Sequence, residues 1–317
     1  MLEVRVSRKV VEADGVCSFE LTPTAGIELP AFTAGAHVDV YVAPGLIRQY
    51  SLCNPPQERS RYLIAVLQEP TSRGGSKAMH AGVTEGSSVQ IGAPRNLFEL
   101  DMGASHYLLF AGGIGITPIL AMAYSLAAVG KSFELHYCGR SIERLAFVEQ
   151  IRATPWGECL RVHVDNGPEE QRLNAASVLA SPSAGDQLYV CGPTGFMNHV
   201  LDNARASGWS ETQLHREDFA AAPQVHENDQ PFKIELTQSG QVLVVPAQRT
   251  ALEVLLEHGV QVESSCEQGI CGACITRVLE GSPDHRDQYM TDVEHARNDC
   301  FTPCCSRSHT PRLVLDL

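Results

Sequence analysis

Hydrophobic and polar residues alternate in short runs along the first hundred positions of the chain. Runs such as LEVRVSRKVV, HVDVYVA and RYLIAVLQ put apolar side chains on one face of a strand and polar side chains on the other. Clusters of turn-forming residues separate these runs, which is typical of a closed antiparallel barrel. The pattern therefore predicts a β-barrel domain over residues 1–101.

From residue 107 the pattern changes to buried strands that alternate with helices. The predicted strands are YLLFA, FELHYCG, RVHVD and QLYVCG, and the predicted helices are ILAMAYSLAAVG, ERLAFVEQIRA, AASVLAS and FMNHVLDNARASG. Such alternation favours a parallel sheet with right-handed crossovers. We therefore expect an α/β domain over residues 102–221.

A third pattern follows a stretch without periodicity, AAAPQVHENDQP, which predicts a linker over residues 222–230. The run FKIELTQSGQVLVVPA predicts a hairpin that turns at Ser239-Gly240. In TALEVLLEHG, Thr250 and Glu253 have the spacing of a helix capping box. The run LVLDL is expected to form a last strand.

Four cysteines near the end of the chain have the spacing of a plant-type 2Fe-2S site. Cys266, Cys271 and Cys274 form the pattern C-x4-C-x2-C, and 29 residues separate Cys274 from Cys304. Three thiolates can come from one tight loop while the fourth returns from a distant segment. We therefore predict a 2Fe-2S cluster in an α+β ferredoxin domain of the β-grasp type over residues 231–317.

Other cysteine chemistry explains the pattern less well. A zinc site usually pairs C-x2-C with a second C-x2-C, and a Rieske centre needs Cys-x-His and Cys-x2-His pairs; the sequence has neither. Eleven cysteines, an odd number, without a signal peptide pattern disfavour disulfides. Spacing favours Cys304 as fourth ligand, although Cys305 is adjacent and Cys300 is a weaker competitor.

Net charge and hydropathy narrow the classes of partner. The formal net charge is −13, which argues against nucleic-acid binding because neutralising phosphates requires clustered Lys and Arg. No apolar run approaches the roughly 20 residues that a membrane span needs. We therefore expect a soluble cytoplasmic protein. Its acidity either steers a partner with a basic face or merely aids solubility.

The segment Arg48-Gln49-Tyr50-Ser51-Leu52 ends a predicted barrel strand and is a candidate flavin site. A flavin needs a cation for its phosphate, an aromatic ring against the isoalloxazine and a hydroxyl near N5, where hydride arrives. Arg48, Tyr50 and Ser51 supply these three groups. The alternative is an ordinary Arg-Tyr pair on an edge strand.

A second segment, Arg73-Gly74-Gly75-Ser76, precedes the apolar-patterned run KAMHAGV. It can open a helix whose free N–H groups, with Arg73 and Ser76, bind a phosphate. A terminal phosphate suits FMN, whereas FAD needs further room for adenosine. The alternative is a plain surface turn.

The turn GGIGITP lies between a buried strand and a helix and is a candidate dinucleotide site. Gly113 and Gly115 let the backbone approach a pyrophosphate, Thr117 is predicted as the helix N-cap, and Pro118 suits the first helical turn. The turn departs from G-x-G-x-x-G, so it is not a standard Rossmann fingerprint. A structural glycine turn is the alternative.

The strand QLYVCG ends in Cys191-Gly192-Pro193 and opens another helix. Ligands bind at the carboxyl ends of parallel strands, so Cys191 is predicted to face the nicotinamide, unless it is only a small buried residue. Coenzyme choice involves Arg140, which could meet a 2′-phosphate, and Asp165, which could accept from a 2′-hydroxyl and repel that phosphate.

Together these motifs resemble the phthalate dioxygenase reductase family over essentially the whole chain. The resemblance is carried by RQYSL, RGGS, GGIGITP, CGPTGFM, the stretch Glu217-Asp218-Phe219, and CEQGICGAC with the TPCCSR return. It implies an FMN barrel, an NADH domain and a 2Fe-2S ferredoxin, in that order. It also implies that Phe219 lies near the flavin ring where nicotinamide enters, beside the candidate catalytic residues Ser51 and Cys191.

The resemblance implies an enzyme, an NADH-dependent iron–sulfur flavoprotein oxidoreductase. Its role would be the reductase component of a two-component Rieske-type aromatic oxygenase or O-demethylase system, with electrons passing from NADH to FMN, to the cluster and to the terminal oxygenase. Two alternatives stay open: a reductase for another acceptor, such as a cytochrome or a deoxysugar-forming enzyme, and a redox sensor.

Overall fold

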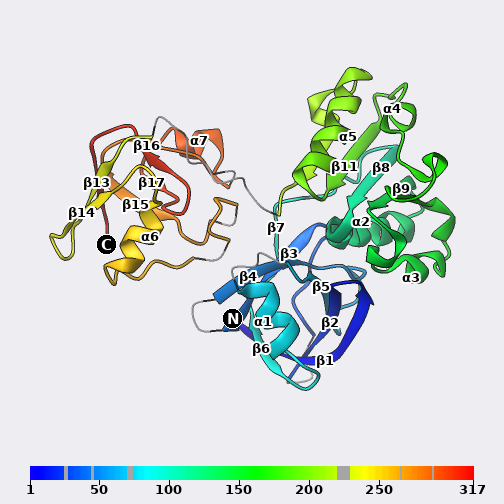
Figure 1. Cartoon of the computed structure of the whole chain (residues 1–317), viewed down its shortest axis with the longest axis horizontal. Helices are drawn as coiled ribbons and strands as arrows, with labels where there is room; N and C mark the ends of the chain where they lie inside the picture. Colours follow the sequence, from blue (N-terminus) through cyan, green and yellow to red (C-terminus); the bar gives the residue numbers. More distant parts are fainter. Residues whose placement is uncertain are drawn as a thin grey trace. The chain divides into compact units, whose positions relative to one another are not determined.

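The computed structural model describes residues 1–24, 28–43, 46–69, 74–219, 229–264, 266–270, 272–287 and 289–317. The chain forms two compact units, Met1–Asp218 and Phe219–Leu317. In Figure 1 the first unit contains a barrel and a parallel sheet flanked by helices, and the second contains a smaller mixed sheet. No helix within the described ranges is long and apolar enough to cross a membrane.

The barrel is a strongly curved antiparallel sheet that closes on itself. Its strands are β1 (Leu2–Ala13), β2 (Val16–Pro23), β3 (Ala36–Ala43), β4 (Leu46–Ser51), β5 (Tyr62–Leu67), β6 (Ser88–Ile91) and β7 (Arg95–Asn96), in the order β4-β3-β6-β1-β2-β5, with β7 beside β3. A bridge between Leu52 and Ile64 joins the two ends of this order. Alternation along the strands turns Val4, Phe19 and Val38 into the barrel core.

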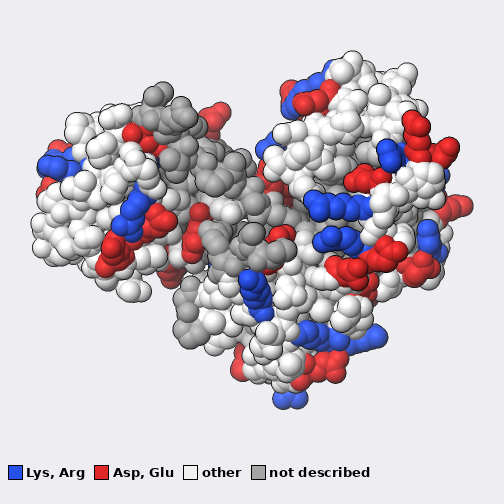
Figure 2. All heavy atoms as spheres, viewed as in Figure 1, with Lys and Arg blue, Asp and Glu red and all other residues white. Residues whose placement is uncertain are grey.

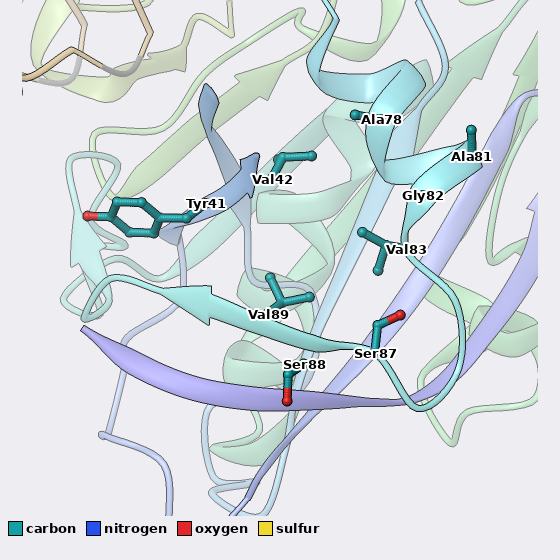
Figure 3. A pocket seen from close by; sticks show the side chains of 9 residues that line it. All are labelled: Tyr41, Val42, Ala78, Ala81, Gly82, Val83, Ser87, Ser88 and Val89. Carbon is teal, nitrogen blue, oxygen red and sulfur yellow. The ribbon is translucent and has the colours of Figure 1, made fainter. Parts of the chain in front are cut away.

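Helix α1 (Gly75–Gly82) packs on the outside of the barrel. A hollow of about 480 Å³ separates its second half from β3 and β6, because Ala78, Ala81 and Gly82 are too small to fill the space. Figure 3 shows these positions opposite Tyr41, Val42 and Val89. The described lining contains no cation, so the hollow does not suit a phosphate.

The α/β part has a parallel sheet in the order β10-β9-β8-β11-β12. Its strands are β8 (His106–Gly112), β9 (Ser132–Gly139), β10 (Leu160–Val164), β11 (Asp186–Cys191) and β12 (Leu214–Glu217). Its α-helices are α2 (Ile116–Ala128), α3 (Val148–Arg152), α4 (Ala175–Val178) and α5 (Thr194–Ala206). Short 3-10 turns are η1 (Gly113–Gly115), η2 (Ile142–Arg144), η3 (Gly157–Cys159), η4 (Glu169–Gln171) and η5 (Glu211–Gln213). One apolar cluster lies under α2 and another under α4 and α5, so both faces of the sheet are covered.

The second unit is a mixed sheet with a helix packed on it. Its main sheet has the order β14-β13-β19-β15-β17, formed by β13 (Phe232–Leu236), β14 (Val242–Val245), β15 (Thr276–Glu280), β17 (Cys300–Phe301) and β19 (Arg312–Leu315). Strands β16 (Pro283–Asp284) and β18 (Arg307–Ser308) pair separately, and the helices are α6 (Ala251–Glu257) and α7 (Asp292–His295). Thr250 and Glu253 form the predicted capping box of α6.

A buried ion-pair network holds the start of this unit in place. Arg286 donates to both carboxylate oxygens of Asp229, at 2.6 and 3.0 Å, and also to Asp284 at 2.5 Å. Of the predicted linker 222–230, only Asp229 and Gln230 belong to the described residues. The four predicted domain ranges stay predictions.

Candidate functional site

The predicted phosphate-binding residues meet at the start of α1. Gly74 precedes the helix with φ +98°, a conformation that glycine adopts without strain, and Gly75 is the first helical residue. A Cβ atom on Gly75 would lie 2.5 Å from Cγ and 2.7 Å from Nε of Arg48 on β4. The side chain of Arg48 therefore packs against the first residue of α1, and a cation beside a helix N-terminus is a donor set that fits a phosphate.

Two other predicted flavin contacts, Tyr50 and Ser51, lie on the same strand as Arg48. The hydroxyl of Ser76 accepts a hydrogen bond from the N–H of Glu69 at 3.1 Å. Burial raises the pKa of Tyr50 above its usual range, so its phenol stays neutral. Ser51 is buried and follows Tyr50 on β4. Arg73 lies outside the described residues.

The predicted dinucleotide residues gather at the carboxyl ends of β8 and β11, where the two backbones touch. A Cβ on Gly192 would lie 2.8 Å from Cα of Gly112, and one on Gly115 would collide with the carbonyl of Cys191. Gly113 differs, because its φ is +52° and no atom lies within 4 Å of a Cβ placed there. Gly115 and Gly192 thus serve backbone packing, and Gly113 has the open space that a ligand needs.

The helix start after this turn differs from the prediction. Helix α2 begins at Ile116, and its N-cap is Gly115, without a side-chain cap. The prediction of Thr117 as N-cap is therefore wrong; its buried hydroxyl donates to the carbonyl of Ile114 at 3.1 Å instead. Pro118 lies in the first turn of α2, as expected. Pro193 is the N-cap residue of α5.

Cys191 has a buried acidic neighbour that sequence reasoning missed. The thiol is fully buried, and burial, followed by Glu217 and Asp218, raises its pKa well above the usual value. Glu217 pairs with Cys191 in the β11–β12 register, and its buried Oε2 has no hydrogen-bond partner among the described residues. Burial, followed by Asp218, raises the pKa of Glu217 to about 8, so the carboxyl is neutral at pH 7.

The two candidate coenzyme-selecting residues follow neighbouring strands. The N–H of Asp165, after β10, donates to the carbonyl of Gly139 at 3.0 Å, and Arg140 follows β9. Both side chains are exposed. Phe219 begins the second unit and is 42% exposed, and its predicted place beside the flavin stays a prediction.

The predicted cluster ligands are assembled in the second unit. Cys274 and Cys304 are buried together with Leu252, and contact with the thiols of Cys274 and Cys305 raises the pKa of Cys304. Sγ of Cys266 accepts from the N–H groups of Gln268 and Ile270, each at 3.4 Å.

Backbone donors directed at a sulfur are the arrangement expected around an iron–sulfur cluster, so this donor set fits a 2Fe-2S group. Cys271 lies outside the described residues.

The two competing cysteines differ in orientation from Cys304. Sγ of Cys305 lies 3.2 Å from the hydroxyl of Thr302 and beside Gly269, where a Cβ would collide with it. Sγ of Cys300 is directed at Sδ of Met290, 3.5 Å away. Of the three described candidates, Cys304 alone is buried together with Cys274, while Cys305 packs against this pair only partly buried, which favours Cys304 as the fourth ligand.

On the face drawn in Figure 2, Lys and Arg side chains are interspersed with Asp and Glu.

The fold and the sites described above define a class of protein, an electron-transfer oxidoreductase with a flavin cradle, a nucleotide edge and an iron–sulfur module in one chain. Residues 234–309 match the family model described as a 2Fe-2S iron-sulfur cluster binding domain.

Relatives extend this match to the whole chain. The chain is 55% identical over 317 residues to "Vanillate O-demethylase oxidoreductase" of Pseudomonas sp. (strain HR199 / DSM 7063), covering all of both chains. It is 39% identical to "Phthalate dioxygenase reductase" of Burkholderia cepacia, over 100% of this chain and 97% of the relative.

A solved phthalate dioxygenase reductase, described as "a modular structure for electron transfer from pyridine nucleotides to [2Fe-2S]", matches with a TM-score of 0.77 and 39% identity, over 100% of this chain and 98% of that one. The chain belongs to the phthalate dioxygenase reductase family. The predicted three-part fold is confirmed, as is the prediction of an iron–sulfur flavoprotein oxidoreductase that transfers electrons for an oxygenase system with FMN, NADH and a 2Fe-2S cluster.

Proposed function

We propose that this chain is the NADH-dependent reductase of a two-component Rieske-type O-demethylase, and that its acceptor is a terminal oxygenase acting on vanillate. The observation that carries the proposal is the identity of 55% over both full lengths to a vanillate O-demethylase oxidoreductase, against 39% to a phthalate dioxygenase reductase. A cytoplasmic location is part of the same proposal.

The barrel residues would bind and orient the flavin. Arg48 and the N–H groups at Gly75 and Ser76 hold the phosphate, and Arg73 adds a second cation. Tyr50 would lie against the ring system, and Ser51 would supply the hydroxyl near N5. When bound, FMN takes a hydride from NADH and releases the electrons one at a time to the 2Fe-2S cluster.

The strand ends of the parallel sheet would position the coenzyme. Gly113 leaves room for the pyrophosphate, next to Thr117 and the N-terminus of α2. Cys191 would face the nicotinamide as a neutral thiol, and the proton on Glu217 would keep a buried negative charge away from it. Asp165 accepts from the ribose 2′-hydroxyl and repels a 2′-phosphate, which selects NADH.

In the second unit, Cys266, Cys271, Cys274 and Cys304 would hold the cluster. The N–H groups directed at Cys266 stabilise the added negative charge when the cluster is reduced.

Reconstitution with a defined oxygenase tests the proposal. The purified chain is mixed with the terminal oxygenase of a vanillate O-demethylase, NADH, oxygen and vanillate. We expect formaldehyde release in proportion to NADH consumed, and a lower coupled rate with a phthalate dioxygenase oxygenase. Rapid cytochrome c reduction without any vanillate turnover would overturn the proposal in favour of another acceptor. Absence of turnover with every acceptor would leave the redox sensor.

A further inference from the structure

Three potential metal ligands of the second unit lie outside the set of cluster cysteines. His285, Asp287 and His295 each offer one nitrogen or oxygen atom, and these atoms all lie within 4.8 Å of one another. His285 and Asp287 follow β16, and His295 ends α7. We call these three residues the His-Asp-His cluster. None of them takes part in the electron path described above.

The carboxylate of Asp287 is already oriented as a ligand would be. Its side chain is completely buried. Oδ2 accepts from the N–H groups of Tyr289 and Met290, at 3.2 and 2.8 Å, so the backbone fixes this oxygen. Oδ1 faces the imidazoles, and the hydroxyl of Thr302 lies 3.3 Å from it. Such outer hydrogen bonds are what orients carboxylate ligands in metal sites.

His285 lacks the partners that a buried imidazole needs. Its side chain is only 10% exposed, and neither ring nitrogen has a hydrogen-bond partner within the described ranges. A buried polar group left in this state is unfavourable, and binding an ion would supply the missing partner.

The donor distances are close to those of a tetrahedral site. Bonds of about 2.0–2.1 Å give donor separations of roughly 3.3–3.5 Å. Nε2 of His295 lies 3.2 Å from Oδ1 of Asp287, and Nδ1 of His285 lies 4.0 Å from the same oxygen. The two rings stack at 4.4 Å between centroids, 20° from parallel, so they would have to rotate out of this stack for both to direct a nitrogen at one ion.

We propose that the His-Asp-His cluster is a second metal site of this protein and that it binds Zn²⁺, with water in the fourth position. Two imidazoles and one carboxylate suit this borderline cation, whereas Mg²⁺ and Ca²⁺ prefer oxygen ligands alone. The bound ion would connect β16 to α7. It would also brace the cluster loop, because a Cβ on Gly269 would lie 3.0 Å from Cα of Asp287.

Zinc uptake by the holoprotein tests this site. The protein carrying FMN and its 2Fe-2S cluster is equilibrated with Zn²⁺ by dialysis, and zinc and iron are measured by elemental analysis. We expect one zinc per FMN in the wild type. His295→Gln should weaken zinc binding by more than about tenfold, because even the loss of an outer-shell partner costs about 10- to 100-fold in metal affinity.

His309→Gln is the matched control, because His309 is 67% exposed and lies 3.8 Å from Asp284, outside the cluster. It should keep the full zinc equivalent. His285→Gln is a second variant, and the visible absorbance of the 2Fe-2S cluster reports folding in each protein. The proposal is overturned if the wild type takes up no zinc, or if His295→Gln binds it as tightly as the wild type. Neither result bears on the proposed reductase function, because that function is tested separately by reconstitution with the oxygenase.

Discussion

Substituting alanine for Gly75 tests the phosphate cradle directly. The added methyl group would lie 2.5 Å from Cγ and 2.7 Å from Nε of Arg48, well inside van der Waals contact. Cγ is in the middle of the side chain, so the whole arginine has to leave its place over the start of α1. The helix itself should survive, because Gly75 does not require a positive φ.

The size of the effect follows from the bond that is lost. A hydrogen bond to a charged group contributes about 1.5–3 kcal/mol. At 1.4 kcal/mol for each tenfold change in affinity, Gly75→Ala should weaken FMN binding by about 10- to 150-fold. Folding stability should change far less, since alanine is a better helix former than glycine.

Titrating FMN into the deflavinated protein and following flavin fluorescence measures this dissociation constant. Gly82→Ala is the control, because Gly82 ends the same helix and no atom lies within 4 Å of a Cβ there. We expect this control to bind FMN like the wild type. Equal affinities for Gly75→Ala and the wild type would show that Arg48 and the helix start do not form the phosphate site.

Three further predictions concern the other sites. Burial raises the pKa of Glu217 to about 8, so the folded protein keeps a proton that the unfolded chain releases, and stability falls as pH rises from about 5 to 8. In urea unfolding, the stability of Glu217→Gln should not show this decrease with pH. If the stabilities of the variant and the wild type changed with pH in parallel, the assignment of the shift to Glu217 would be contradicted. Cys304→Ser should abolish cluster absorbance but keep NADH–ferricyanide activity through the flavin, whereas Cys305→Ser should keep both; the reverse pattern would make Cys305 the ligand. Cys191→Ala should slow flavin reduction by NADH in stopped-flow experiments while FMN stays bound, and bleaching at the wild-type rate would exclude a role for the thiol.

Elements that depend only on residues close together in the sequence were predicted correctly. The capping box of Thr250 and Glu253 and the hairpin turn at Gly240 need only a few residues each, and both are present. The predicted helix ERLAFVEQIRA is instead divided, because Phe147 adopts a left-handed φ of 66° and α3 starts only at Val148. Apolar periodicity continues through that break and gives no sign of it.

Features that depend on distant residues were harder to predict. Strand β12 carries LHRE, which has no strand-like alternation, and its edge position beside β11 depends on pairing with a segment more than twenty residues earlier. The neutral state of Glu217 follows from that pairing, because the sheet buries the carboxyl. The stretch Glu217-Asp218-Phe219 was visible as a motif, but its acidity alone predicts a charged, solvated side chain.

The contact between the backbones at Gly112 and Gly192 has a consequence for how the coenzyme site can vary. No side chain separates the ends of β8 and β11 at this point, so a single methyl group on Gly192 would act as a wedge between them. The distance between the two strand ends is therefore set by direct contact between their main chains. Side chains that line the coenzyme path can therefore change without altering the distance between β8 and β11, the two strands that position them.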